Sequence, residues 1–250
     1  MFKKLVTVAL VATIAAASAG SAIAQPMQIR IATEGAYPPF NQKDAAGNLV
    51  GFDIDIANAL CAEMKAECTV VAQDWDGIIP GLVANKYDAI IASMSITPER
   101  QQSVGFTEPY YSNYLHVMAK KGSGIAGADD LAGKSVGAER STVASQWAED
   151  NLGRSADVKL YDTQTAAYSD LDAGRIDAMV SDIYPAYDWL QTHDGFEFIG
   201  DNIDIADKIG IAVRKDDNEL REALNGALKT IRDNGTYATI NAKYFPFDIY

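Results

Sequence analysis

The sequence predicts an α/β protein of two lobes. Strand-like apolar runs alternate with helix-like periodic segments, the alternation occurs twice along the chain, and one more strand and helix follow the second block. Such alternation is typical of parallel sheets covered by helices. The roughly 225 residues from position 25 onward are too many for one minimal domain and suit either two lobes or one large domain.

The first 24 residues predict a signal peptide. Lys3 and Lys4 precede an apolar run over residues 5–17, and small residues end in an Ala-x-Ala site at 22–24. A membrane anchor is the less favoured alternative, because the run is shorter than the roughly 20 residues that span a bilayer. We therefore expect an exported mature chain that begins near Gln25. No cysteine stands at the cleavage site to carry a lipid.

The first block contains the predicted strands 29–32, 69–72 and 89–92 and the predicted helices 53–65 and 76–84. In the first helix, apolar side chains recur every four residues from Ile56 to Met64, behind Asp53 as the predicted N-cap. The second helix has one apolar face behind Asp74 or Asp76. These apolar faces predict core packing rather than a cofactor site.

The second block contains the predicted strands 135–138, 158–161 and 178–180 and the predicted helices 143–151 and 165–173. A strand at 209–213 and an amphipathic helix at 220–233 follow it, and we expect both to return to the first lobe. The segments 110–118 and 201–208 are the predicted crossings between lobes. The expected lobes are therefore 25–112 with 209–250, and 113–208.

The charge of the chain limits the classes of partner. Its formal net charge is −13, and loss of the two positive charges of Lys3 and Lys4 on cleavage leaves −15. An acidic surface repels phosphate, which argues against nucleic acid and anionic membranes as partners. A cationic ligand would be attracted.

The only two cysteines, Cys61 and Cys68, stand at the end of one predicted helix and the start of the next predicted strand. In an oxidising compartment such a pair is expected to form a disulfide, and two free thiols are the alternative. No zinc site is expected, because two cysteines without a neighbouring histidine do not supply its ligands. No other metal and no cofactor is predicted.

Six segments of the mature chain resemble the periplasmic solute-binding proteins that deliver polar amino acids to ABC transporters. They are residues 29–40 (IRIATEGAYPPF), 51–55 (GFDID), 74–80 (DWDGIIP), 88–100 (DAIIASMSITPER), 174–177 (GRID) and 243–245 (KYF). The chain is most similar to the lysine/arginine/ornithine-binding and arginine/ornithine-binding members, which also have a cysteine pair at positions 61 and 68. This resemblance implies two α/β lobes joined by two hinge strands, the type II periplasmic binding-protein fold, and closure on a cationic amino acid. It also implies a periplasmic location and a membrane permease as partner; we expect a monomer.

A buried amino acid needs a partner for its carboxylate and one for its ammonium group. Arg100 follows Thr97-Pro98-Glu99, a helix-start pattern, and the resemblance assigns it the carboxylate; a surface arginine paired with Glu99 or Glu108 is the alternative. Asp182 ends a predicted strand, and the resemblance assigns it the ammonium group, with Ser93 or Ser95 beside it. The alternative for Asp182 is an N-cap for a helix over 183–190.

Ser141 and Thr142 form a predicted N-cap in the second lobe whose backbone N–H groups could reach the same carboxylate, and an ordinary helix cap is the alternative. Relatives usually have a glycine before this pair. This chain instead has Arg140 after Glu139 and one residue fewer. The resemblance therefore does not determine which ligand contacts the second lobe makes, and Arg140 could repel a cationic ligand.

Specificity is expected to lie with Glu34, Tyr37 and Trp75, because a carboxylate between aromatic faces suits a guanidinium or ammonium tip. A solvated Glu34 and a core Trp75 are the alternatives. Ala92 and Val143 stand where cationic binders often carry polar residues, which leaves room for histidine or an opine. Glutamine is a further alternative, because relatives that bind uncharged amides also carry an acid at the position of Glu34.

Two other functions remain as rivals. A few periplasmic dehydratases share the implied fold, and Glu34, Glu139 or Asp182 could serve one as general acid. Against this, no nucleophile motif is present, and His116 and His193 lie far from the motifs and from each other. A sensory ectodomain is the other rival, but the chain carries no kinase or second membrane helix.

Overall fold

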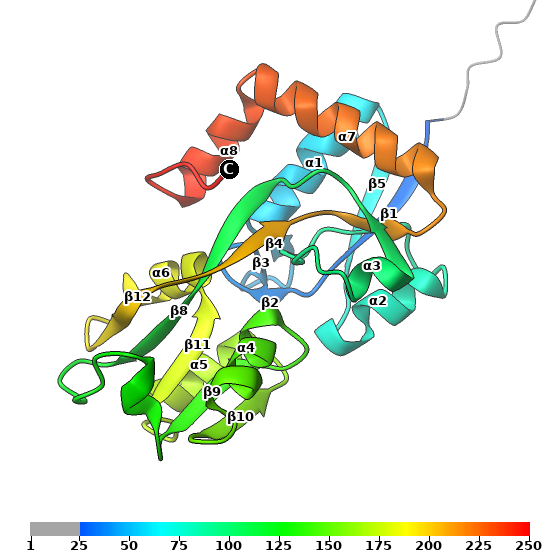
Figure 1. Cartoon of the computed structure of the whole chain (residues 1–250). Helices are drawn as coiled ribbons and strands as arrows, with labels where there is room; N and C mark the ends of the chain where they lie inside the picture. Colours follow the sequence, from blue (N-terminus) through cyan, green and yellow to red (C-terminus); the bar gives the residue numbers. More distant parts are fainter. Residues whose placement is uncertain (1–25) are drawn as a thin grey trace, which may run out of the picture.

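The structure, a computed structural model, describes residues 26–250; the predicted signal peptide lies outside the described residues. Two five-stranded sheets form the framework of two lobes (Figure 1). The first has the strand order β5 (Glu67–Ala72), β1 (Gln28–Thr33), β6 (Ala89–Ile90), β13 (Ala212–Arg214) and β7 (Val104–Phe106). The second has the order β10 (Asp157–Tyr161), β9 (Ser135–Glu139), β11 (Ala178–Asp182), β8 (Tyr111–Lys120) and β12 (Phe196–Ile209).

Each sheet has a parallel part and an antiparallel part. β1 is parallel to β5 and β6, and β9 is parallel to β10 and β11, as the two alternating blocks predict. β13 is antiparallel to β6 and β7, and β8 is antiparallel to β11 and β12. The antiparallel strands are thus those outside the two alternating blocks.

Helices cover the sheets, and the larger ones match the predicted segments to within one or two residues at most ends. They are α1 (Phe52–Met64), α2 (Trp75–Val83), α3 (Arg100–Ser103), α4 (Val143–Leu152), α5 (Gln164–Asp172), α6 (Ile183–Leu190), α7 (Asn218–Asp233), α8 (Thr236–Tyr244) and the 3-10 helix η1 (Ala128–Leu131). A three-stranded sheet of β2 (Ala36–Tyr37), β3 (Asn41–Lys43) and β4 (Leu49–Val50) was not predicted. No helix among residues 26–250 combines the length and apolar character of a membrane span.

Two long strands run between the lobes. β8 and β12 pair antiparallel from Phe196 opposite Lys120 to Ile209 opposite Tyr111, with two irregularities between Ile199 and Asp207 (Figure 1). The predicted crossings 110–118 and 201–208 fall almost wholly within these strands. The two lobes are therefore joined by a paired ribbon.

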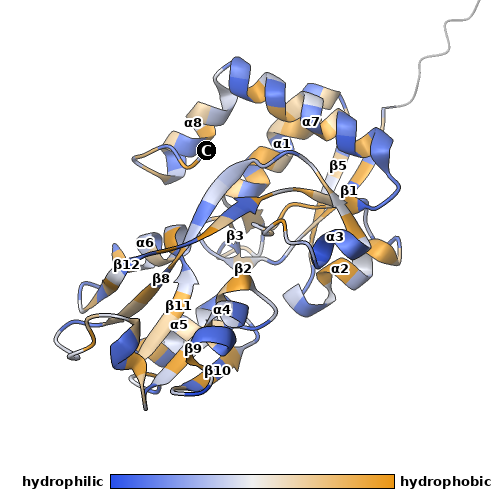
Figure 2. Cartoon of the chain, viewed as in Figure 1, coloured by the Kyte–Doolittle hydropathy of each residue, from blue (hydrophilic) through white to orange (hydrophobic). Residues whose placement is uncertain are grey.

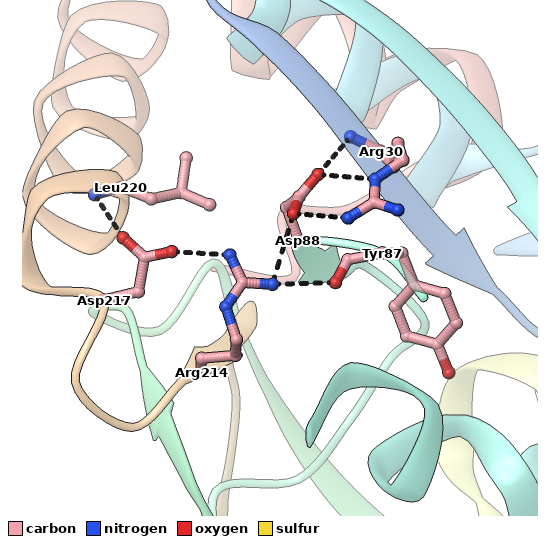
Figure 3. A network of polar contacts seen from close by, with 6 residues as sticks. All are labelled: Arg30, Tyr87, Asp88, Arg214, Asp217 and Leu220. Atoms are coloured by element: carbon pink, nitrogen blue, oxygen red, sulfur yellow. Dashed lines mark hydrogen bonds and ion pairs between the residues drawn. The ribbon is translucent and has the colours of Figure 1, made fainter. Parts of the chain in front are cut away.

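The last strand and helix return to the first lobe, as predicted. α7 shows alternating hydrophilic and hydrophobic bands (Figure 2), and its buried side chains, among them Leu224 and Leu228, belong to the core of α1 and β1. A polar network joins β13 and the start of α7 to β1 and to the residue before β6 (Figure 3). Asp88 accepts hydrogen bonds from Arg30 (Nη2, 2.9 Å) and Arg214 (Nη1, 3.2 Å), and Arg214 also donates to Asp217 (2.9 Å), which caps α7.

The predicted N-cap of α1 is wrong. The cap position is Gly51, and Asp53 lies inside the first turn with its side chain fully buried. That carboxylate accepts hydrogen bonds from Asn41 (2.8 Å), Tyr110 (2.7 Å) and Ser93 (3.0 Å) instead of from the helix backbone. At α2, Asp74 occupies the cap position without a side-chain hydrogen bond. The predicted disulfide is present between Cys61 and Cys68 and joins α1 to β5.

Candidate ligand-binding site

A small cavity lies between the two lobes. It is lined by Glu34, Tyr37, Trp75, Ala92, Ser93, Ser95, Arg100, Glu139, Thr142, Val143 and Asp182. Every residue predicted to bind ligand is in this set except Ser141, and Glu139 is the one member that was not predicted as a ligand contact. The structure therefore gathers, from opposite halves of the chain, the side chains that the sequence singled out.

The topology explains why these residues meet. Glu34 directly follows β1, Ala92 and Ser93 follow β6, and Glu139 and Asp182 are the last residues of β9 and β11. The carboxyl ends of neighbouring parallel strands open on one edge of a sheet, where ligands of such sheets bind. In this chain the two edges face each other across the cavity.

Arg100 is the cation of the cavity. Its Nη1 donates to the carbonyl of Ser95 (2.9 Å), its Nη2 donates to the carbonyl of Ser141 (3.0 Å), and its guanidinium lies 5.3 Å from the ring centre of Trp75. Within residues 26–250 it has no carboxylate at ion-pair distance, so the alternative pairing with Glu99 or Glu108 is not observed. Burial lowers its pKa, while nearby carboxylates raise it. An anion in the cavity would supply the missing partner.

Asp182 faces the cavity rather than capping α6. It occupies the cap position without a side-chain bond to the helix, and its carboxylate accepts a hydrogen bond from the Tyr37 hydroxyl across the lobes (2.5 Å). Burial, then the charge of Asp207, raises the pKa of Asp182 to about 7. A ligand ammonium group beside Asp182 would favour its ionised form.

Ser93 and Ser95 each donate their hydroxyl hydrogen to a buried carboxylate. Ser93 Oγ donates to Asp53 (3.0 Å) and Ser95 Oγ donates to Asp207 (3.1 Å). Ser93 also has a φ of 52°, an uncommon conformation for a residue other than glycine, and its N–H donates to the Tyr110 hydroxyl (3.0 Å). Since both hydroxyl hydrogens are used, the two oxygens can only accept hydrogen bonds from a ligand.

Thr142 is the N-cap of α4, as predicted. Its Oγ1 accepts from the N–H of Ser145 (3.1 Å), and the Ser145 hydroxyl accepts from the N–H of Thr142 (3.1 Å), which completes a reciprocal capping pair. Thr142 and Val143 thus bring the start of α4 to the cavity wall.

Ser141 and Arg140 join the lobes outside the cavity. The Ser141 hydroxyl donates to Asp76 (3.0 Å), and its carbonyl accepts from Trp75 Nε1 (3.2 Å). Arg140 forms ion pairs with Asp76 (3.3 Å) and with Asp162. The guanidinium of Arg140 therefore binds carboxylates beside the cavity. The position of Arg140 does not support the possibility that it repels a cationic ligand.

Glu139 is the cavity residue that sequence reasoning did not predict as a ligand contact, since it was considered only as the general acid of a rival enzyme. The signal that could have found it is its position at the end of a strand parallel to the one that ends in Asp182. Its side chain is 2 % exposed and that of Glu34 is 8 % exposed. Among the described residues, no group of three or more metal-ligating side chains is found.

Comparison with known proteins places these features in a family. Residues 29–247 match the bacterial extracellular solute-binding proteins, family 3. The chain is 43% identical over 231 residues to the L-arginine-binding protein of Pseudomonas aeruginosa, covering 89% of each chain. It is 41% identical to the lysine/arginine/ornithine-binding periplasmic protein of Escherichia coli, covering 93% of each.

Solved structures show the same architecture. An ancestral arginine-binding protein bound to arginine superposes with a TM-score of 0.83 at 36% identity, over 87% of this chain and 98% of the other. The family match, residues 29–247, includes every residue that lines the cavity and all of both sheets except Gln28, the first residue of β1. This chain belongs to family 3 of the bacterial extracellular solute-binding proteins.

Proposed function

We propose that this chain is the periplasmic ligand-capturing subunit of an ABC importer and that it binds L-arginine, L-ornithine or L-lysine. The observation that carries the proposal is the charge arrangement of the cavity: one arginine without a carboxylate partner faces three buried carboxyl groups, Glu34, Glu139 and Asp182. A cationic amino acid offers one anionic and two cationic groups, which suits that set. The relatives named as arginine-binding and lysine/arginine/ornithine-binding proteins support the same ligand class.

The proposed roles follow from the free hydrogen-bonding capacity of each residue. Arg100 binds the ligand carboxylate, and Asp182 binds the ammonium group together with the acceptor oxygens of Ser93 and Ser95. The start of α4, next to Thr142, also lies at the cavity wall, where free backbone N–H groups of a helix N-terminus favour an anion.

Glu34 holds the cationic tip of the ligand side chain. Tyr37 and Trp75 line the same cavity, and their ring faces favour a planar guanidinium over a compact ammonium. Ala92 and Val143 form an apolar stretch of the cavity wall. An opine, which carries a substituent that a simple amino acid lacks, is therefore the second candidate ligand. Histidine and glutamine are further candidates.

We propose that capture proceeds by closure of two lobes, residues 25–112 with 209–250 and residues 113–208, about the β8–β12 ribbon. Contacts across the cleft, such as Tyr37 with Asp182 and Trp75 with Ser141, support this division. A ligand held by both lobes stabilises the closed form only as far as it binds that form better. The closed form would then be recognised by the permease.

No catalytic role is proposed. The relatives compared above are named as binding proteins, and neither His116 nor His193 lines the cavity. Recovery of bound ligand in unchanged chemical form would distinguish a carrier from a dehydratase of the same fold.

A thermal-shift screen of refolded, ligand-stripped protein tests the proposal. A ligand at 100 times its dissociation constant adds about 2.7 kcal/mol to the free energy of unfolding. Arginine, ornithine and lysine should each raise the melting temperature. Shifts with glutamine, histidine or an opine alone would overturn the cationic specificity, and the absence of any shift would overturn the amino-acid-binding function.

A further inference from the structure

Two glutamates meet in the cavity from opposite lobes. Glu34 follows β1 of the first sheet, and Glu139 ends β9 of the second. Both side chains line the cavity, both are more than nine-tenths buried, and each has a buried Oε1 with no hydrogen-bond donor among the described residues. A buried carboxylate oxygen without a donor is costly, so the pair requires either a proton or a cation.

The charges around the pair do not neutralise it. Asp74 lies near Glu34, and Asp76 and Asp182 lie near Glu139, so all three neighbours add negative charge. Arg140, next to Glu139 in the chain, is engaged by Asp76 and Asp162 outside the cavity.

Arg100, the other cation at the site, does not neutralise the pair either. It interacts with the charges of Asp207, Asp182 and Glu99, and not with those of Glu34 and Glu139. In the proposed function it binds the ligand carboxylate, while Asp182 binds the ligand ammonium group. Two carboxyl groups are then left for a single side-chain tip.

The protonation of the pair follows from its burial. Burial raises the pKa of Glu34 to about 7, against the lowering effect of the neighbouring Glu139 carboxyl group. Burial, and then the charge of Glu34, raises the pKa of Glu139 well above its usual range. At neutral pH the two carboxyl groups therefore titrate as a pair and retain a shared proton when no cation lies between them.

We propose that Glu139 is a second specificity-determining residue, which binds the cationic side-chain tip jointly with Glu34, and that the tip displaces the proton these two glutamates otherwise share. This inference rests on the proposed function and deepens it. The O–H bond of one carboxyl group breaks, its proton passes to the solvent, and the ligand cation keeps all of its own protons. An uncharged ligand of the same shape leaves the proton in place.

Two consequences can be measured. Binding of arginine releases a proton near pH 7, so arginine affinity rises with pH, whereas binding of citrulline, the uncharged isostere of arginine, releases none. Glu139→Gln removes one of the two coupled carboxyl groups but leaves Glu34 buried, so the proton release on arginine binding should become smaller than in the wild type. The variant should also lose roughly tenfold or more of the preference for arginine over citrulline.

Isothermal titration calorimetry tests this with ligand-stripped protein at pH 7 in two buffers of different ionisation enthalpy. The samples are the wild type, Glu139→Gln, and Glu197→Gln as a control whose glutamate is exposed on β12 and does not line the cavity. The expected result is equal proton release with arginine in the wild type and the control, and a smaller release in Glu139→Gln.

The outcomes separate this inference from the proposed function. Arginine binding without proton release in the wild type would overturn the inference alone, and this part needs no variant to fold. An unchanged arginine preference in a folded Glu139→Gln protein would overturn it as well. Failure of the wild type to bind arginine, ornithine or lysine would overturn the proposed function itself.

Discussion

Arg100 has two carbonyl contacts and an aromatic face but no carboxylate partner among the described residues, which leaves its charge available to a ligand. Replacing it with alanine should weaken arginine binding by roughly 100-fold or more, because a buried charge-assisted contact contributes several times more than a surface ion pair. The same loss is expected for every amino acid that binds, since all share the carboxylate.

Arg154 supplies the matched control for this prediction. It is exposed and lies outside the cavity lining. Calorimetric titration of Arg154→Ala should reproduce wild-type affinity. If Arg100→Ala retained affinity for arginine while remaining folded, the carboxylate would have another partner.

The buried Asp53 should make the free energy of unfolding decrease as the pH rises. Burial raises its pKa to about 6 from an ordinary value of 3.8, so the folded state binds the proton more tightly than the unfolded state. The resulting stabilisation is fully present below pH 3.8 and is lost as the pH rises to about 6. The free energy of unfolding of the wild type, minus that of Asp53→Asn, should therefore fall over this interval by up to roughly 3 kcal/mol.

Urea unfolding of both proteins at several pH values between 4 and 7 measures this difference. A difference that stays constant with pH would show that Asp53 does not titrate in that interval. The comparison with Asp53→Asn is needed because burial also raises the pKa of Glu34 and Asp182, which both proteins retain.

Asp53 and Glu139 also show where residue-level prediction stops. Asp53 was predicted as a cap because aspartate commonly begins helices, yet its partners Asn41, Ser93 and Tyr110 come from three distant segments whose convergence no local pattern reveals. Glu34 and Asp182 were predicted because family resemblance and strand-end position agreed, and Arg100 because resemblance and a helix-start pattern agreed. Glu139 had only the strand-end position.

Thr142, at the start of α4, is expected both to stabilise the helix as its N-cap and to contribute to ligand binding. Thr142→Ala removes the capping oxygen that accepts from Ser145, and it should lower the free energy of unfolding by about 1 kcal/mol. Because Thr142 also lines the cavity, arginine affinity should fall too. Thermal unfolding and calorimetric titration measure the two effects.

Thr163 is the matched control, since its Oγ1 caps α5 through the N–H of Ala166 (3.2 Å) but does not line the cavity. Thr163→Ala should cost a similar stability and leave affinity unchanged. Equal affinity losses in both variants would mean that stability, rather than the position of Thr142, governs binding.

Element prediction succeeded where periodicity was long and failed where it was short. The helices at 143–151 and 165–173 were predicted to within one residue at each end because their apolar spacing is regular. β2, β3 and β4 have two or three residues each, too few for an alternating pattern, and they depend on pairing with one another. α8 was missed because Gly235, at φ 83°, ends one helix and begins the next.

At the scale of the whole molecule, the fold makes a site out of two separate halves. The two α/β blocks were visible in the sequence because strands and helices alternate in each. Their opposition across the β8–β12 ribbon was implied by family resemblance, since the pairing of Phe196 with Lys120 and of Ile209 with Tyr111 joins residues that are about 75 to 100 positions apart. Pairing between residues so far apart in the chain produces no local pattern in the sequence from which it could be predicted.

The measurement that tests the central claim most directly is calorimetric titration of ligand-stripped wild-type protein and Glu34→Gln with L-arginine and with L-glutamine. The predicted result is saturable one-to-one binding of arginine to the wild type, weakened roughly tenfold or more in Glu34→Gln, with glutamine affinity changed far less. Binding of glutamine in preference to arginine by the wild type, or equal losses for both ligands in Glu34→Gln, would contradict a cleft built to close on a cationic amino acid.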